Sequence, residues 1–326
     1  MEGKRLLEIK DLHTVFHTDD GAVRAVDGVD LWVDEGEVLG LVGESGCGKS
    51  VTAHSVMRLV SPPGRIESGE ILFRGRNLLK VSQREMHQVR GSRIAMIYQE
   101  PMSSLNPLLR VGTQIVETVT MHMHKTKREA LGLAVDMLRA VGIPDPEHRV
   151  HDDPHQLSGG MRQRVMIAMG MVCNPRLMIA DEPTTALDVS IQAQILDLLR
   201  NLVRETNAAV MLITHDMGVV AETADRVAVM YTGKVVEQAD VKTLFTRPAH
   251  PYTQGLLASI PDVSRPVPED RILPAIPGTV PSLLRLPAGC SFRSRCAKST
   301  DKCGREAPPL FSLHSGHDVR CWLYEQ

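Results

Sequence analysis

The feature that most constrains this chain is a glycine-rich octapeptide that lies between an apolar run and a segment of helical composition. Residues 43–50 read Gly-Glu-Ser-Gly-Cys-Gly-Lys-Ser, which satisfies the pattern GxxxxGK[ST] in full. The apolar residues 38–42 precede it, and a segment able to form a helix follows it up to Pro62. A strand, a loop and a helix in this order are the context that the motif requires. The sequence therefore predicts a phosphate-binding loop in an α/β domain.

Each part of this loop suits a triphosphate for a different reason. Glycines let the backbone curl so that successive N–H groups point inward and surround phosphate oxygens at the start of a helix. Lys49 adds a positive charge for the outer phosphates, and the Ser50 hydroxyl can ligate Mg²⁺. The alternative is a glycine-rich turn that binds no ligand, and the motifs described below argue against it. We expect the chain to bind a nucleoside triphosphate with Mg²⁺.

Composition excludes several other classes of protein. The chain has 326 residues, of which 43% are hydrophobic, so it can bury a sizeable core. Its formal net charge of −2 provides no bulk basic field for nucleic acid. No apolar run approaches the roughly 20 residues that a membrane helix needs, and the first residues contain no secretory apolar core. These features predict a soluble protein that reaches a membrane only through a partner.

Hydrophobic patterning predicts alternating strands and helices. Short alternating apolar stretches in residues 6–40 indicate a β-rich start. Residues 114–141 are expected to be helical, because apolar residues recur there at steps of three and four, at Leu131, Val135, Leu138 and Val141. Residues 176–180 and 209–213 are predicted to be short buried strands, which indicates a parallel α/β sheet. Prolines become frequent after about residue 247, so a separate tail with little regular sheet or helix is expected there.

Two acidic residues follow the apolar run 177–180 and form a second candidate element of a nucleotide site. At the end of a strand, Asp181 can hold Mg²⁺ through water, and Glu182 can orient or deprotonate an attacking water. Gln99, which follows the apolar run 94–98, can reach the same metal and water. His215 ends another strand and is suited to sense the γ-phosphate. Each of these residues, taken alone, is equally compatible with an exposed strand end.

A third element opens a helix with Ser158, Gly159 and Gly160. Bare N–H groups at such a helix start attract an anion. Since the chain already has a complete phosphate loop, we expect this segment to serve the nucleotide of a partner subunit, although a simple helix cap is the alternative. Asp188 fits a loop that contacts the opposite subunit.

The order and spacing of these motifs resemble an ATP-binding-cassette ATPase over roughly residues 5–250. A longer resemblance, to the ATP-binding D subunits of oligopeptide and dipeptide importers, covers essentially the whole chain. It is carried by the proline-rich, four-cysteine tail and by three strings, residues 98–107, 158–161 and 250–253. Met161 stands where many cassettes have glutamine. Members of this subfamily also have methionine at this position.

This resemblance implies an architecture with two parts. Residues 1–250 would form a nucleotide-binding domain that has a mostly parallel sheet, an antiparallel β-subdomain and a helical subdomain at about residues 100–165. Residues 251–326 would form a small irregular extension that is rich in cysteine.

The resemblance also implies a role for each motif residue. Phe16 would stack on the adenine. The phosphates would be held by Gly43, Ser45, Gly46, Cys47, Gly48, Lys49, Ser50 and Val51. Mg²⁺ would be bound by Ser50, Gln99 and Asp181, with Glu182 as catalytic base and His215 as switch. The contacts across the dimer interface would come from Ser158, Gly159, Gly160 and Asp188.

Four of the six cysteines lie in the last 40 residues or so, with the spacing C-x₅-C-x₆-C-x₁₇-C. This spacing lacks the close pair with which zinc sites usually begin, whereas four thiolates can hold an iron–sulfur cluster without one. The spacing alone leaves a metal site and free thiols open. The resemblance implies a [4Fe–4S] cluster ligated by Cys290, Cys296, Cys303 and Cys321. A structural role is favoured over redox sensing.

The implied activity is ATP hydrolysis that powers an importer from the cytoplasmic face of the membrane. The implied partners are two transmembrane permease subunits, a second ATPase subunit that is either different or a copy of this chain, and indirectly an extracytoplasmic binding protein. Peptides are the favoured cargo, and nickel, glutathione and oligosaccharides are alternatives.

Two other classes of cassette ATPase are alternatives to a transporter subunit. Cassette ATPases of DNA repair carry a long insertion between the glutamine and the serine-glycine motif, but only about 58 residues separate Gln99 from Leu157. Ribosome-associated cassette proteins normally have two phosphate loops in one chain, whereas this sequence contains one such motif.

Overall fold

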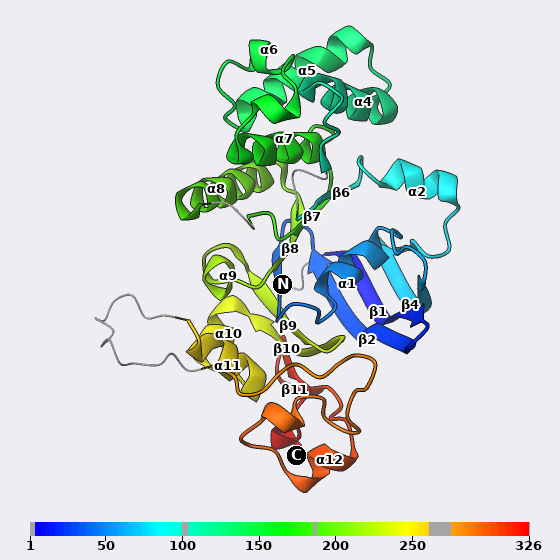
Figure 1. The fold of residues 1–326 in the computed structure, drawn as a ribbon, viewed down its shortest axis with the longest axis vertical. Coiled ribbons are helices and arrows are strands. Elements are labelled where there is room, and N and C mark those ends of the chain that lie inside the picture. The colour runs from blue at the N-terminus through cyan, green and yellow to red at the C-terminus, as the bar shows by residue number, and fades with distance from the viewer. Residues whose placement is uncertain (1–3, 100–103, 185–187, 261–274, 326) are drawn as a thin grey trace, which may run out of the picture. The chain divides into compact units, whose positions relative to one another are not determined.

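The computed structural model describes residues 4–99, 104–184, 188–260 and 275–325 (Figure 1). The chain divides into two compact units, each built from three segments. The first unit comprises Met1–Leu6, Val33–Glu37 and Asn77–Leu212, and the second comprises Leu7–Trp32, Val38–Arg76 and Ile213–Gln326. The boundary predicted near residue 250 stays a prediction. No helix in the described ranges combines the length and the apolar character that crossing a membrane requires.

An antiparallel sheet forms one part of the second unit. Its strands lie in the order β2 (Gly21–Asp34), β1 (Arg5–Thr18), β4 (Gly64–Phe73) and β5 (Arg76–Asn77). The pairing of β1 with β4 shifts register between Lys10 and Thr14, which changes the face on which the apolar residues lie. This explains why Leu7, Ile9, Leu12 and Val15 are all buried although their spacing is not strictly alternate. The β-rich start that the sequence predicts is confirmed.

The second unit also holds a run of neighbouring strands in the order β11 (Phe311–His314), β12 (His317–Val319), β10 (Lys234–Asp240), β9 (Arg226–Tyr231) and β3 (Val38–Val42). β3 and β9 are parallel, and the other pairs are antiparallel. A tight turn at Thr232 and Gly233, both with positive φ, joins β9 to β10, as a two-residue hairpin requires. Its helices are α1 (Lys49–Val56), α9 (Met217–Thr223), α10 (Val241–Thr246), α11 (Pro251–Ala258) and α12 (Asp301–Arg305).

The proline-rich tail packs onto this sheet. Sequence analysis did not anticipate β11 and β12, which extend the sheet beyond β10. The tail also shares a core with the hairpin, in which Tyr231 packs against Tyr252 and Phe292 with ring centroids 4.7 and 5.2 Å away. Such tilted and edge-to-face aromatic pairs stabilise a fold beyond the area that they bury. The tail therefore shares a hydrophobic core with the rest of the second unit.

Among the described residues, the first unit holds β6, β7 and most of β8, together with several helices. β6 (Ile94–Ile97) pairs in parallel with β7 (Leu177–Asp181), and β8 (Ala209–Thr214) lies next to β7. All residues of β7 and β8 are buried, as expected for parallel strands that are covered on both faces. Both strands follow the sequence prediction closely. The helices are α2 (Gln83–Val89), α4 (Val111–Met123), α5 (Lys127–Ala140), α6 (Pro146–Arg149), α7 (Gly159–Met171) and α8 (Val189–Thr206).

The helical character expected over residues 114–141 is confirmed, and two helices supply it. A left-handed residue, His124, ends α4, and Thr126 starts α5 as the N-cap of a capping box with Glu129. The buried face of α5 consists of Ala130, Ala134 and Leu138, whereas Leu131 is 37% exposed. Of the four apolar residues that indicated a helix, Leu138 and Val141 are buried and Leu131 is exposed. Because small alanines form much of this face, the spacing of large apolar residues in the sequence detects it poorly.

Candidate nucleotide-binding site

The phosphate loop in the second unit joins β3 to α1, as the motif predicts. Gly48 is the N-cap of α1 and has φ of 107°, a conformation that side chains rarely allow. A Cβ atom at Gly48 would overlap the carbonyl oxygen of Ala25, and one at Gly43 would overlap that of Met230. Both positions therefore require glycine, because the loop lies against β2 and β9.

Lys49 is held inside this loop. Its side chain is buried, and its ammonium group donates hydrogen bonds to the carbonyl oxygens of Gly43 (2.7 Å) and Glu44 (3.1 Å). Cys47 is also buried, and this burial raises the pKa of its thiol despite the nearby Lys49 charge. Cys47 thus packs as a neutral thiol and is no candidate nucleophile. The binding of phosphate by Lys49 stays a prediction.

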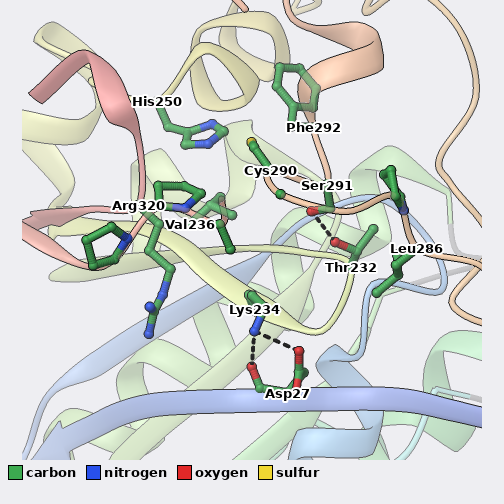
Figure 2. A pocket seen from close by; sticks show the side chains of 15 residues that line it. Asp27, Thr232, Lys234, Val236, His250, Leu286, Cys290, Ser291, Phe292 and Arg320 are labelled. Carbon is green, nitrogen blue, oxygen red and sulfur yellow. Dashed lines mark hydrogen bonds and ion pairs between the residues drawn. The ribbon is translucent and has the colours of Figure 1, made fainter. Parts of the chain in front are cut away.

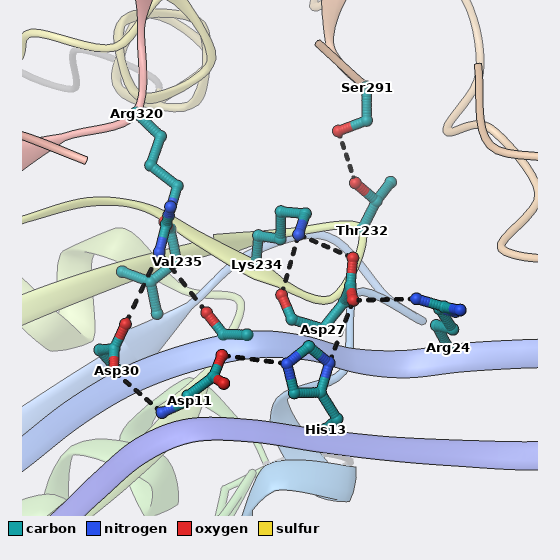
Figure 3. A network of polar contacts seen from close by, with 11 residues as sticks. Asp11, His13, Arg24, Asp27, Asp30, Thr232, Lys234, Val235, Ser291 and Arg320 are labelled. Atoms are coloured by element: carbon teal, nitrogen blue, oxygen red, sulfur yellow. Dashed lines mark hydrogen bonds and ion pairs between the residues drawn. The ribbon is translucent and has the colours of Figure 1, made fainter. Parts of the chain in front are cut away.

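The loop rests on the turn between β9 and β10. The Gly233 N–H donates to the Cys47 carbonyl (2.9 Å), and the Asp27 N–H donates to the Gly233 carbonyl (2.9 Å). Lys234, the next residue of the turn, forms an ion pair with the Asp27 carboxylate at 2.7 Å (Figure 3). These contacts connect β2, the turn and the phosphate loop into one network.

Asp27 is the centre of this polar network. His13 Nδ1 lies 3.2 Å and Arg24 Nη1 lies 3.7 Å from its Oδ1, in addition to the Lys234 contact (Figure 3). Burial alone would raise the pKa of Asp27, but Lys234 opposes that effect, with help from His13 and Arg24, so the pKa lies below its ordinary value. The carboxylate therefore remains charged and fixes Lys234 beside the turn.

The remaining candidates of the second unit are Phe16 and His215. Phe16 is half-buried on β1 opposite Gly64, and its ring occupies the space that a Cβ atom on Gly64 would need. This contact gives the aromatic residue a packing role, and its stacking on adenine stays a prediction. His215 is exposed directly after β8 and precedes the N-cap of α9, Asp216. Its switch role also stays a prediction.

In the first unit, the ends of β6 and β7 bring the acidic motif and Gln99 together. Ile97 pairs with Ala180, so both strands end at the same edge of the sheet. Asp181 is buried at the end of β7, and Glu182 follows it with a left-handed φ of 46°. The Gln99 amide Nε2 donates a hydrogen bond to Glu182 Oε2 at 2.9 Å. A carboxylate oriented in this way is suited to act as a general base.

The first unit also positions the second glycine motif at a helix start. Ser158 is the N-cap of α7, and its Oγ accepts a hydrogen bond from the Met161 N–H at 3.3 Å. Gly160 packs closely against Ile191 of α8, where a Cβ atom would meet the Ile191 side chain at 2.9 Å. Asp188 is the exposed N-cap of α8. The neighbouring Ala186 and Leu187, like Glu100–Ser103 after Gln99, lie outside the described residues. Contacts to a second subunit stay a prediction.

The four tail cysteines line a single pocket. They are Cys290, Cys296, Cys303 and Cys321, and Phe292 and Trp322 also contribute to its wall. Burial, together with the three neighbouring thiols, raises the pKa of the Cys321 thiol to about 11. Across the described ranges, no group of three or more His, Cys, Asp or Glu side chains converges on a point where one metal ion could bind.

A larger cavity of about 490 Å³ shares Cys290, His250 and Phe292 with the cysteine pocket (Figure 2). Its cationic side chains already have partners. Lys234 pairs with Asp27, and Arg320 Nε donates to the Val235 carbonyl at 3.1 Å. The Thr232 hydroxyl and the Ser291 hydroxyl are 2.7 Å apart along its wall. This cavity therefore lies between the β9–β10 turn and the tail.

Sequence analysis missed residues that contact the phosphate loop from far along the chain. The Tyr252 hydroxyl accepts a hydrogen bond from the Glu44 N–H at 2.8 Å, and Arg295 pairs with the Glu44 carboxylate at 2.6 Å. These partners are 208 and 251 residues from Glu44, so no local pattern could have revealed them.

Two family models match this chain. One is described as ABC transporter and matches residues 26–185, and the other is described as the C-terminal region of oligopeptide/dipeptide transporters and matches residues 236–303. The chain is 53% identical to the probable peptide ABC transporter ATP-binding protein y4tR of Sinorhizobium fredii, over 97% of this chain and 94% of that protein. It is 51% identical to the oligopeptide transport ATP-binding protein OppD of Bacillus subtilis, over 98% of this chain and 89% of that protein.

Solved structures share the fold. The ATP-binding cassette MJ0796, a dimer bound to ADP and Pi, matches with a TM-score of 0.65 and 25% identity, over 72% of this chain and 98% of that one. The protein cbiO1 of Clostridium perfringens, which is part of the cbiONQ complex, matches with a TM-score of 0.64 and 27% identity, over 75% and 92% of the two chains. The mixed α/β fold expected from the sequence is confirmed.

Proposed function

We propose that this chain, which belongs to the family of ABC transporter ATP-binding proteins, is the subunit that hydrolyses ATP to power the uptake of di- and oligopeptides. Its relatives are ATP-binding proteins of peptide transport over nearly their whole lengths. One structural observation carries the hydrolytic part: a complete phosphate loop occurs in the same chain as a strand-end carboxylate, Glu182, that is oriented by Gln99. The chain is an ATPase of this family.

The residues present suit ATP and Mg²⁺. The helix-starting loop provides N–H groups for phosphate oxygens and Lys49 provides a cation, while Ser50 and Asp181 provide the oxygen ligands that Mg²⁺ prefers. Bound Mg²⁺ would neutralise charge on the phosphates. Glu182 accepts a proton from the attacking water, and Gln99 holds the carboxylate in place. His215 is assigned the switch role and Phe16 the adenine contact.

A second ATPase subunit would complete the site. Ser158 starts α7 with a glycine pair, so the helix presents N–H groups to an anion. We assign this segment and Asp188 to the nucleotide of the opposite subunit, which is either a different protein or a second copy. Support comes from the related cassette MJ0796, which is dimeric in its ADP-bound structure. Two permease subunits would anchor the pair at the cytoplasmic face of the membrane, and an extracytoplasmic protein would deliver the cargo.

We assign a [4Fe–4S] cluster to Cys290, Cys296, Cys303 and Cys321. In such a cluster each thiolate binds a different iron, so the four sulfurs surround a volume and need not converge on one point. The support for this assignment is that all four cysteines line one pocket, so their thiolates are available to a single group. The cluster would connect segments of the tail that are otherwise irregular.

Uptake by the assembled transporter tests the cargo. The chain would be co-expressed with its permease and binding-protein partners and reconstituted into vesicles, and ATP-dependent uptake of labelled di- and oligopeptides would be measured. Nickel, glutathione and an oligosaccharide would be assayed in parallel, with the Glu182→Gln variant as the inactive control. Uptake of one of these three instead of peptides would replace the cargo assignment. Co-purification with DNA or ribosomes, without permeases, would contradict the transport function.

Anaerobic purification tests the cluster. We expect a visible charge-transfer absorption and iron in a ratio of about four per chain. The Cys303→Ser variant is expected to lose both signals, whereas Cys173→Ser is the matched control because Cys173 lies outside the tail. Wild-type protein without iron under anaerobic conditions would contradict this assignment.

A further inference from the structure

The tail of the second unit contacts the phosphate loop directly, through Glu44. The Arg295 guanidinium donates to both oxygens of the Glu44 carboxylate, with Nη1 2.6 Å from Oε2 and Nη2 3.0 Å from Oε1. The Tyr252 hydroxyl accepts the hydrogen bond of the Glu44 N–H at 2.8 Å. Both the side chain and the backbone of Glu44 are thus fixed by residues beyond position 250.

Arg295 is itself firmly held. It is 6% exposed, its Nε donates to the Pro277 carbonyl at 2.9 Å, and its guanidinium lies about 6 Å from the ring centroids of Tyr231 and Phe292. A paired arginine in such a partly buried position interacts more strongly than an exposed one, because less water screens it. The position of Arg295 is therefore set before any ligand binds.

Glu44 places a negative charge in a loop that must receive a polyanion. Without a counter-charge, this carboxylate would repel the phosphates, and Lys49 would interact with it instead of with them. The Lys49 ammonium lies 3.1 Å from the main-chain carbonyl oxygen of Glu44, so the lysine charge is close to the backbone of this residue. Arg295 supplies the counter-charge and leaves the Lys49 charge available for the nucleotide.

We propose that Arg295 and Tyr252 are positioning residues for ATP: Arg295 neutralises and orients Glu44, and Tyr252 fixes the Glu44 backbone, so that the tail sets the affinity of the phosphate loop. This proposal depends on ATP binding by the chain and not on the identity of its cargo. It also gives the tail a role in the nucleotide cycle that does not depend on whether a cluster is present.

The test measures binding of a fluorescent ATP analogue, mant-ATP, to the full-length chain. For Arg295→Gln we expect the dissociation constant to rise about tenfold, because an unneutralised carboxylate remains beside the phosphates. The double variant Glu44→Gln/Arg295→Gln removes that charge and is expected to recover affinity to within about threefold of wild type. Arg295→Lys keeps the charge but loses the two-pronged contact with the carboxylate, so its dissociation constant is expected to lie between those of wild type and Arg295→Gln.

Arg293→Gln is the matched control. Arg293 lies in the same short turn (Arg293–Arg295), but its Nη1 donates to the Gly304 carbonyl within the tail and does not reach the loop. We expect it to leave the mant-ATP affinity unchanged. In steady-state assays of the assembled ATPase, Arg295→Gln is expected to raise KM for ATP while kcat changes less than about twofold, which is the signature of lost ground-state binding.

Two results would overturn the proposal. One is wild-type affinity in Arg295→Gln, and the other is a double variant that binds as weakly as Arg295→Gln alone, because that would indicate structural damage rather than charge. If Arg295→Gln does not fold, Tyr252→Phe decides the matter, since it removes a single oxygen. It is expected to raise the dissociation constant about threefold, and an unchanged constant in a folded Tyr252→Phe variant would contradict the proposal.

Discussion

Gln99 and Glu182 are joined by a hydrogen bond of 2.9 Å although 83 residues separate them. Their strands, β6 and β7, are parallel neighbours that end together, so the two residues that follow them meet at one edge of the sheet. The left-handed φ of Glu182 turns the chain sharply at this point. This geometry explains how a residue next to a buried strand can present its carboxylate to a substrate.

Replacement of Glu182 by glutamine should separate binding from hydrolysis. The amide keeps the size of the side chain but cannot accept the proton of the attacking water, so we expect turnover to fall roughly 10²- to 10⁴-fold. The affinity for ATP should remain near that of wild type. Phosphate release and mant-ATP binding measure the two quantities. Near-normal turnover would show that Glu182 is not the base.

Lys49→Ala is expected to weaken the binding of ATP, in contrast to Glu182→Gln, which should mainly slow hydrolysis. A hydrogen bond to a charged group contributes about 1.5–3 kcal/mol, so we expect the affinity for ATP to fall at least roughly tenfold. The melting temperature should be measured alongside, because Lys49 also donates to Gly43 and Glu44 within the loop. Exposed Lys242, replaced by alanine, is the control. Retained affinity in Lys49→Ala would exclude the loop as the phosphate site.

Glu237 is predicted to be critical for the stability of the second unit. Its fully buried carboxylate accepts hydrogen bonds from the Ala249 and His250 N–H groups and lies 2.9 Å from His317 Nε2. Glu237→Ala would leave all three groups without this partner, and we expect a loss of about 3–5 kcal/mol in the free energy of unfolding. Denaturant unfolding measures it.

Glu237→Gln is the matched variant, since an amide oxygen can still accept one or two of these hydrogen bonds, and its loss should be smaller. An alanine variant that unfolds at the same denaturant concentration as wild type would contradict the role of Glu237.

The ion pair between Asp27 and Lys234 should make stability depend on pH in the acid range. Folding lowers the pKa of Asp27 below its ordinary value of 3.8, so the folded state binds fewer protons there than the unfolded state. The stabilisation is therefore present above about pH 4 and is lost as the pH falls through the lowered pKa. Lys234→Met should remove it.

The difference in melting temperature between Lys234→Met and wild type should then shrink as the pH falls from 7 to 3. Lys242→Met is the control for loss of one exposed lysine. A difference that does not change with pH would indicate that packing, rather than the charge of Asp27, explains the effect of the variant.

Sequence patterns predicted the parts of this molecule that follow from local chemistry. The phosphate loop, the acidic strand end after β7 and the helix start at Ser158 were all identifiable, because backbone requirements dictate their residues. Gln99 was expected to reach the metal and the attacking water, and its hydrogen bond to Glu182 is a contact that the sequence did not predict. Apolar spacing predicted the helical character of α5 but did not identify its buried face, to which Ala130 and Ala134 contribute along with Leu138.

Contacts between distant segments could not be predicted in this way. Arg295 and Tyr252 reach Glu44 only because the tail folds back over the β9–β10 turn, and prolines in the tail concealed β11 and β12. The roles predicted for Phe16, His215 and Asp188 are contacts with a nucleotide or a second subunit. Neither the sequence pattern nor the fold of one chain contains those contacts.

The pairing of β12 with β10 has a further consequence for any shortened form of this protein. A chain cut after α11 would expose the backbone amides and carbonyls of β10 along a free sheet edge, which is a template for association with another copy. Its Glu237 would also lose His317. Truncated protein is therefore expected to aggregate. By covering the edge of β10, the tail would keep the protein soluble, in addition to its proposed effect on nucleotide affinity.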